Sequence, residues 1–160
     1  MRALNEQIKR ADERLAEVVE GDEVVARRCT VRGVGPVMAT SFASTLDDVS
    51  RFSDAKQVRA YLGLVPSEYN SGERQQRGGI SKAGPGRARS MLVEAGWLIL
   101  RGRNPATEAL YEWGARIALR RGKKVAAVAL ARKLAGILYA MWRDGTSFTA
   151  QSPRALSVAA

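Results

Sequence analysis

Histidine is absent from the 160-residue sequence, and cysteine occurs only once, at Cys29. The absence of histidine excludes a Ser-His-Asp triad and most transition-metal sites. A single cysteine excludes an intrachain disulfide and a cysteine-based zinc site. We therefore expect Cys29 to be a small buried hydrophobic residue.

Aromatic residues are also scarce, at 6%, although hydrophobic residues make up 46% of the chain and are mostly Ala, Val and Leu. This balance favours packed helices over a β-sandwich and predicts an all-α fold. The sequence shows no signal peptide and no apolar run of about 18 residues that could span a membrane. We therefore expect a cytoplasmic protein with no membrane partner.

Acidic residues become rare toward the C-terminus, and the chain has a net charge of +10. Residues 1–30 are balanced, with six basic and seven acidic side chains, whereas residues 113–160 have nine basic side chains and one acidic. Such an excess indicates a polyanionic partner, because Lys and Arg displace counterions when they neutralise phosphates. We predict that DNA binds to the second half of the chain.

The few carboxylates of the second half are scattered and show no metal-ligand spacing (Glu73, Glu94, Glu108, Glu112 and Asp144). This distribution argues against general acid–base catalysis by paired carboxylates and against a self-contained two-metal nuclease site. We expect no metal ion or cofactor on this chain.

Residues 2–28 are predicted to form one long helix. Its apolar residues recur at alternating spacings of four and three, with one polar interruption, in the series Leu4, Ile8, Ala11, Leu15, Val18, Asp22 and Val25. This heptad spacing is typical of a coiled coil, in which a polar residue can fix the register. A helix lying on the domain's own core is the alternative. We favour a coiled-coil arm over residues 1–30, through which the chain forms a homo-oligomer.

Glycine and proline dominate the start of the next segment, where Gly33 and Gly35 precede Pro36. Glycine suits a tight entry and proline suits the first turn of a helix. The pattern resembles the hairpin of helix-hairpin-helix DNA-binding modules, in which backbone N–H groups at a helix N-terminus bind a phosphate. An ordinary helix–helix turn is the alternative.

Further helices are expected over residues 36–46, 53–62, 86–102, 105–121 and 123–143, with Ser53 as a helix cap. Tyr139 and Trp142 are expected to lie in the core rather than to stack on bases. Residues 31–145 would form the main helical domain and residues 146–160 a frayed tail. Four basic residues of the last helix are candidate nucleic-acid contacts: Lys123, Lys124, Arg132 and Lys133.

Residues 67–86 show no apolar periodicity and contain five glycines. We expect a glycine-rich basic loop here, because an irregular segment of about twenty residues inside a compact domain usually either has a function or is disordered. A flexible solvated loop is the alternative. The candidate phosphate contacts in and just beyond this loop are Arg74, Arg77, Lys82, Arg87 and Arg89.

Ser71 lies in this loop, directly before Gly72, and is the candidate nucleophile. A serine hydroxyl that attacks a DNA phosphate forms a phosphoserine, which conserves the bond energy and lets strands be rejoined without a nucleotide cofactor. Such a step needs cations around the phosphoryl oxygens. Ser67 and Ser81 are the alternatives.

Several motifs occur together in a fixed order: residues 33–39 (GVGPVMA), 51–55 (RFSDA), 60–66 (AYLGLVP), 70–72 (NSG) and 79–84 (GISKAG), then Arg87 and Arg89. The set resembles the C-terminal domain of the insertion-sequence transposases related to the Piv/MooV DNA invertases, some of which are bridge-RNA-guided recombinases. Residues 122–124, 131–134 and 138–141 are similar to that family's C-terminal helix.

The resemblance implies that Ser71 is the nucleophilic serine, that the Gly33–Gly35 turn is a helix-hairpin-helix-like element, and that the first helix assembles oligomers. It also implies that the basic loop and the last helix contact DNA and a guide RNA. Family members carry an N-terminal RuvC-like domain whose acidic residues bind Mg²⁺, and this sequence offers no counterpart. We therefore expect Mg²⁺ on a RuvC-like domain outside this sequence, and no catalysis by this chain alone.

The expected function is that of a transposase domain, which acts in serine-mediated cleavage and strand exchange of DNA during transposition of an insertion sequence. Two alternatives stay open: a non-catalytic nucleic-acid-binding module, and a helical interaction protein whose coiled-coil arm is the functional part. Covalent capture of DNA and nucleic-acid binding at low salt distinguish the three.

Overall fold

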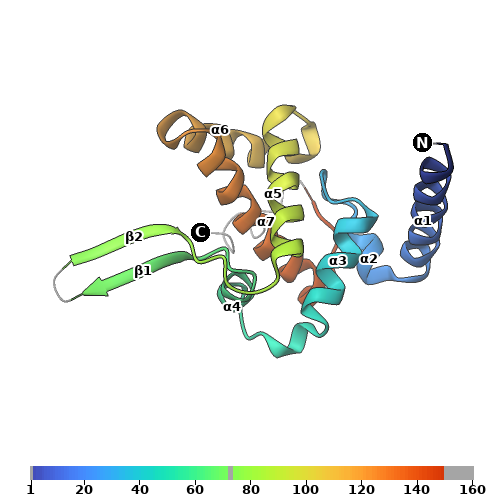
Figure 1. The fold of residues 1–160 in the computed structure, drawn as a ribbon, viewed down its shortest axis with the longest axis horizontal. Helices are drawn as coiled ribbons and strands as arrows, with labels where there is room; N and C mark the ends of the chain where they lie inside the picture. The colour runs from blue at the N-terminus through green and yellow to red at the C-terminus, as the bar shows by residue number, and fades with distance from the viewer. Residues whose placement is uncertain (1, 72–73, 150–160) are drawn as a thin grey trace.

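The computed structural model describes residues 2–71 and 74–149. Within these residues the chain forms seven α-helices: α1 (Arg2–Gly21), α2 (Glu23–Arg28), α3 (Pro36–Leu46), α4 (Ala55–Tyr61), α5 (Gly86–Arg101), α6 (Glu108–Arg121) and α7 (Lys123–Asp144). Two strands, β1 (Pro66–Ser71) and β2 (Arg74–Ile80), form an antiparallel hairpin that extends from the helical body (Figure 1). The mainly helical fold predicted from the sequence is confirmed.

Helix α7 lies at the centre of the fold, and α4, α5 and α6 pack around it (Figure 1). By length and composition it could cross a membrane, which corrects the sequence-based statement that no such run exists. However, 67% of its most apolar stretch is buried inside the protein, as expected of a core helix. Tyr139 is buried and its hydroxyl donates to the Phe52 carbonyl at 2.8 Å, while Trp142 packs against the core, so both are core residues as predicted.

Gly96 permits the close packing of α5 on α7. A Cβ atom at this position would lie 2.5 Å from the Ala127 carbonyl oxygen. Gly96→Ala is therefore expected to lower the free energy of unfolding by about 1–3 kcal/mol, because the two helices must move apart. Urea denaturation would measure the change. Gly21→Ala, where a Cβ meets nothing within 4 Å, is the control, and an equal loss in both variants would contradict this account.

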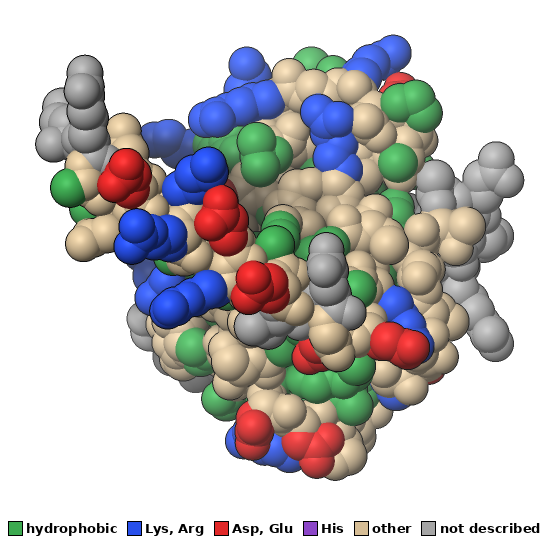
Figure 2. Space-filling view, turned by 90° about the vertical axis from the view of Figure 1, so that its right-hand side faces the viewer, with side chains coloured by type: hydrophobic (Ala, Val, Ile, Leu, Met, Phe, Trp, Pro, Cys, Tyr) green, Lys and Arg blue, Asp and Glu red, His purple; other side chains and the backbone are tan. Residues whose placement is uncertain are grey.

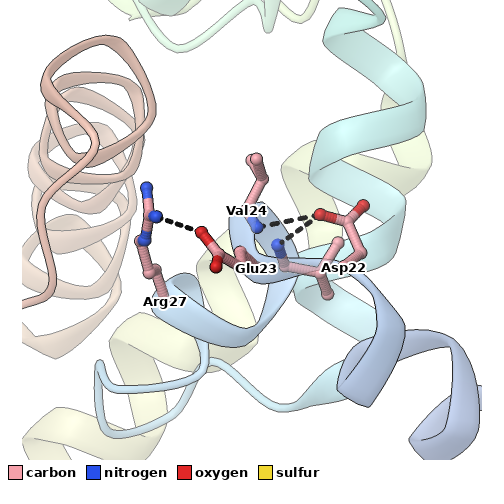
Figure 3. Close-up of polar contacts among 5 residues, drawn as sticks. Asp22, Glu23, Val24 and Arg27 are labelled. Carbon is pink, nitrogen blue, oxygen red and sulfur yellow. Dashed lines mark hydrogen bonds and ion pairs between the residues drawn. The ribbon is translucent and has the colours of Figure 1, made fainter.

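The predicted single helix over residues 2–28 is wrong, because the chain breaks at Asp22. The Asp22 carboxylate accepts hydrogen bonds from the backbone N–H groups of Val24 (2.8 Å) and Val25 (3.2 Å) and thereby caps α2 (Figure 3). Within α2, Arg27 pairs with Glu23. Asp, like Asn and Ser, favours such N-caps over helix interiors, so the polar interruption in the heptad series marks a helix boundary rather than a register.

Helix α1 lies to one side of the helical body (Figure 1). Leu4 and Ile8 are 59% and 52% exposed, so the N-terminal part of the apolar seam is not covered within this chain. The face of the molecule on which α1 lies shows acidic and basic side chains next to one another (Figure 2). The coiled-coil arm and the homo-oligomer stay predictions.

Two further expectations are corrected. Asp54, not Ser53, caps α4, because its carboxylate accepts from the backbone N–H groups of Lys56 (2.8 Å) and Gln57 (2.9 Å). Residues 67–86 are not an irregular loop, since most of them belong to the β1–β2 hairpin. The predicted frayed tail falls mainly on residues 150–160, which lie outside the described residues; the segment before them includes Phe148, whose N–H donates to the Thr30 hydroxyl at 2.9 Å.

Candidate nucleic-acid interface

The base of the hairpin is held to the end of α4 by backbone contacts at two glycines. Gly63 and Gly84 have φ angles of +66° and +78°, which favour glycine. The Lys82 N–H donates to the Gly63 carbonyl at 3.1 Å, and the Ser81 N–H donates to the Val65 carbonyl at 2.8 Å. A Cβ atom on Gly84 would lie 2.1 Å from the Tyr61 carbonyl oxygen, so the two segments touch backbone to backbone.

Arg89 adds to this junction. Its guanidinium donates from Nη1 to the carbonyl oxygens of Leu62 (3.1 Å) and Ala83 (3.2 Å), which lie on the two sides of the hairpin base. These hydrogen bonds give Arg89 a role in positioning the hairpin, whereas the sequence suggested a phosphate contact. The same guanidinium can still contribute positive charge to its surroundings.

Ser71 is the last residue of β1 and lies at the far end of the hairpin. The strand register pairs it with Arg74, the first residue of β2, and pairs Glu68 with Arg77. Ser71 and Arg74 are therefore neighbours in the strand register, and the roles of Ser71 as nucleophile and of Arg74 as its cation stay predictions. Gly72, which follows Ser71, lies outside the described residues.

A groove of about 910 Å³ runs between the base of the hairpin, α6 and α7. Apolar residues of all three elements form what we name the apolar floor: Leu64, Pro66, Ile80, Trp113, Ile117, Val125, Val128 and Ala129. Basic residues form what we name the cationic rim: Lys82, Arg121, Lys124, Arg132 and Lys133. None of the described residues that line this groove is Asp or Glu, so every charged residue among them is basic.

Lys133 is the most buried member of the cationic rim, with 5% exposure. Its ammonium lies 4.4 Å from the centre of the Trp113 ring, a cation–π contact. Burial, together with the positive charges of Arg59 and Arg116, lowers the pKa of Lys133 from its ordinary value. Arg59 itself is buried against Gly136 of α7, and burial and Arg132 lower its pKa. This side of the groove thus concentrates positive charge in a poorly hydrated place.

The lowered pKa of Lys133 predicts a pH dependence of stability. Between the lowered pKa of the folded protein and about 10.4 in the unfolded chain, the unfolded chain binds more protons, so the free energy of unfolding rises with pH. The stability advantage of Lys133→Met over the parent protein should therefore shrink as pH rises through this window. Urea denaturation at several pH values measures it, with Lys123→Met as the control for removing an exposed charge from α7. A difference that stays constant with pH would contradict the prediction.

The other candidate residues lie apart from one another. Lys123 is exposed at the start of α7, whereas Lys124 lies on the cationic rim. Arg87 lines a different pocket, of about 340 Å³, with Leu15 of α1 and residues of α3. Lys82 and Arg87 therefore line different pockets, whereas Arg74 and Arg77 belong to β2 of the hairpin.

The Gly33–Gly35 turn joins α2 to α3. Gly33 has a φ of +88° and lies close to α5, since a Cβ there would be 3.3 Å from the Ala95 carbonyl oxygen. Gly35 precedes Pro36 at the N-terminus of α3, and a Cβ there would meet nothing within 4 Å. The open space at Gly35 suits the approach of a phosphate, and the helix-hairpin-helix role stays a prediction.

Sequence reasoning missed three basic residues. Arg121 lies on the cationic rim, whereas the sequence indicates only that a helix ends at this residue. Arg59 and Arg28 are buried, at 2% and 0% exposure. The Arg28 guanidinium lies 4.0 Å from the Trp142 ring centre, and burial lowers its pKa to about 10. Phe42 and Trp142, both distant in the sequence, lie against the Arg28 guanidinium, and no local sequence pattern indicates this contact.

Among the described residues, no three or more His, Cys, Asp or Glu side chains lie close enough together to bind a metal ion. The Mg²⁺ that the family resemblance implies belongs to a RuvC-like domain outside this sequence, and it stays a prediction. Cys29 is half-buried beside the core, and burial raises the pKa of its thiol.

Comparison with known proteins identifies the family. The family profile described as "Transposase IS116/IS110/IS902 family" matches residues 26–112, more than half of the chain. The chain is 34% identical over 148 residues to a "Probable family 20 transposase" of Pseudomonas aeruginosa, which covers 92% of this chain and 44% of that protein.

It is also 32% identical over 146 residues to the "Transposase for insertion sequence element IS1328" of Yersinia enterocolitica, which covers 91% of this chain and 44% of that protein. The chain thus spans less than half the length of these curated relatives. The profile match and these similarities support one conclusion: this chain belongs to the IS116/IS110/IS902 family of transposases.

Proposed function

We propose that this chain is the strand-transfer domain of its transposase family and that the hydroxyl of Ser71 is the nucleophile. The observation that carries this proposal is the position of Ser71 at the far end of a projecting hairpin, opposite Arg74 in the strand register. A nucleophile at the end of a hairpin can reach a phosphate of a duplex that is too wide to enter a pocket. The resemblance to transposases related to the Piv/MooV invertases supports the same assignment.

In the proposed step, the Ser71 oxygen attacks a DNA phosphorus and forms a phosphoserine bond. The bond from phosphorus to one deoxyribose oxygen breaks, and the Ser71 proton is lost while the departing oxygen gains one. Arg74 is the nearest cation in the register and would stabilise the negative charge that develops on the phosphoryl oxygens. Attack by a second deoxyribose hydroxyl reverses the step and rejoins strands.

DNA is the proposed partner, and a guide RNA of the bridge type is proposed with it, because the cationic rim can neutralise the phosphates of either. Homo-oligomerisation through the exposed seam of α1 belongs to the same proposal. A RuvC-like domain with Mg²⁺ would complete the active site from outside this sequence.

Covalent capture on a nicked suicide DNA substrate tests the proposal. The reaction is run with the 160-residue chain and repeated with a RuvC-like domain of the family added in trans. The expected product is a protein–DNA adduct whose peptide map places the phosphate on Ser71. An adduct on another residue, or none in either reaction, would overturn the serine mechanism.

A non-catalytic binding module is the second candidate, and the charge of the groove favours it independently of Ser71. If the cationic rim binds phosphates, Arg121→Ala with Lys124→Ala should reduce the slope of log K against log salt by about two, since each lost phosphate contact removes about 0.9. Fluorescence anisotropy with labelled DNA measures the slope. The control is Lys9→Ala with Arg10→Ala on α1, and an unchanged slope in the groove variant would show that DNA binds elsewhere.

A further inference from the structure

The groove between the hairpin and α6–α7 combines two surfaces that a double helix would not use together. A duplex presents phosphates outside and keeps its base faces stacked, so it can satisfy the cationic rim but has little apolar surface for the floor. An unpaired strand presents phosphates and base faces at once. Proteins that bind single strands typically combine a positive groove with apolar and aromatic side chains for the bases.

The apolar floor is large enough and open enough for this purpose. The volume of about 910 Å³ lies in the range of pockets that hold small organic ligands, which suits a few nucleotides. Val125 is 42% exposed, so a bound group could cover apolar surface that now faces solvent. Trp113 adds one aromatic side chain, whose ring also makes the cation–π contact with the Lys133 ammonium.

The charged residues among the described lining of the groove are all basic. Lys82 enters from the hairpin base, Arg121 from the end of α6, and Lys124, Arg132 and Lys133 from α7. Two of the charges that act on buried Lys133, those of Arg59 and Arg116, are themselves positive. A phosphate placed here would relieve repulsion between neighbouring positive charges, whereas a neutral or cationic partner would not.

We propose that this groove binds an unpaired nucleic-acid strand, with bases on the apolar floor and phosphates along the cationic rim. This inference rests on the proposed function, since it assigns a strand to the same transposase domain. The groove lies at the base of the hairpin, and β1 runs from Pro66 to Ser71 over about 17 Å at ~3.3 Å per residue. The unpaired segment would therefore lie about five duplex steps from the proposed scissile phosphate, at ~3.4 Å per step.

The test compares two substitutions of the same kind. Val125→Ser lies on the apolar floor, and Leu119→Ser lies on α6 outside the groove, where Leu119 is 88% exposed. Neither side chain is buried, so both variants should fold, and thermal denaturation would verify it. Binding is measured by fluorescence anisotropy with labelled oligothymidylate and oligouridylate of about eight nucleotides, and with a blunt DNA duplex.

Val125→Ser is expected to weaken binding of at least one single-stranded probe by about threefold to tenfold, with less than about a twofold change for the duplex. Leu119→Ser should change neither. The single-stranded probe that shows the loss identifies the bound strand as DNA or RNA. Equal losses for single strand and duplex, or no loss with either single strand, would overturn the inference. Covalent capture at Ser71 is a separate readout, so failure here is distinguishable from failure of the serine mechanism.

Discussion

Ser71→Ala is expected to reduce covalent capture of DNA by about 10³-fold or more, because removal of a nucleophile leaves only the residual effects of binding and electrostatics. The residue lies at the end of β1, far from the α7 core, so the substitution should leave the fold intact. Adduct yield on a suicide substrate is the measurement, with equilibrium DNA binding measured in parallel. We expect that binding to change by less than about twofold, since one hydroxyl contributes little to binding dominated by phosphate contacts.

Ser81→Ala and Ser67→Ala are the matched controls for that experiment. Ser81 is exposed just after β2, and Ser67 donates a hydrogen bond to the Gly79 carbonyl at 3.0 Å near the hairpin base. Both should retain adduct formation, although Ser67→Ala loses one hydrogen bond within the hairpin. Loss of the adduct in Ser81→Ala with retention in Ser71→Ala would identify Ser81, at the base of the hairpin, as the nucleophile and refute the proposal.

Gly84→Ala is expected to lower the free energy of unfolding by about 2–4 kcal/mol. Two costs add: alanine is strained at a φ of +78°, by about 1 kcal/mol or more, and its Cβ would lie 2.1 Å from the Tyr61 carbonyl, which forces the backbone to shift at about 1–3 kcal/mol. Urea denaturation followed by far-UV circular dichroism measures the change.

Gly79→Ala provides the control for the substitution at Gly84. Gly79 belongs to the same hairpin, its φ is not positive, and a Cβ there would meet nothing within 4 Å. We expect its free energy of unfolding to change by less than about 0.5 kcal/mol. If Gly84→Ala were equally mild, the hairpin base would not be held against α4 as the structure indicates.

The helices were predictable from apolar residues that repeat with helical period and from composition. Composition marked α7, whose Ala, Val and Leu residues form the centre of the core: every residue from Lys133 to Tyr139 is buried, and Tyr139 is a core residue as predicted. The hairpin was not predictable in this way. Its strands are polar and extend from the body, so no alternation of apolar residues marks them. Strand propensity did not mark them either, because only Tyr69 and Ile80 among their residues favour a β-strand.

The arrangement of the candidate residues could be predicted only in part. Spacing along the chain placed Ser71 near Arg74, and antiparallel register does bring these two together. Spacing also grouped Arg87 and Arg89 with them, yet α5 turns Arg87 toward another pocket and Arg89 onto backbone carbonyls. The apolar floor joins residues from the hairpin, α6 and α7, and only the packing of these elements reveals that they share one surface.

The hairpin joins the helical body at its base, through Gly63, Gly84 and Arg89. The length of the hairpin, which sets the distance of Ser71 from the body, is therefore independent of the packing that stabilises the helices. Lengthening each strand by two residues would carry Ser71 outward by about 6–7 Å and keep every side chain on its original face, because strands repeat every two residues. Such an insertion leaves the contacts of α7 unchanged. Distance from the body to the reacting phosphate can therefore vary among related chains through hairpin length alone, without redesign of the core.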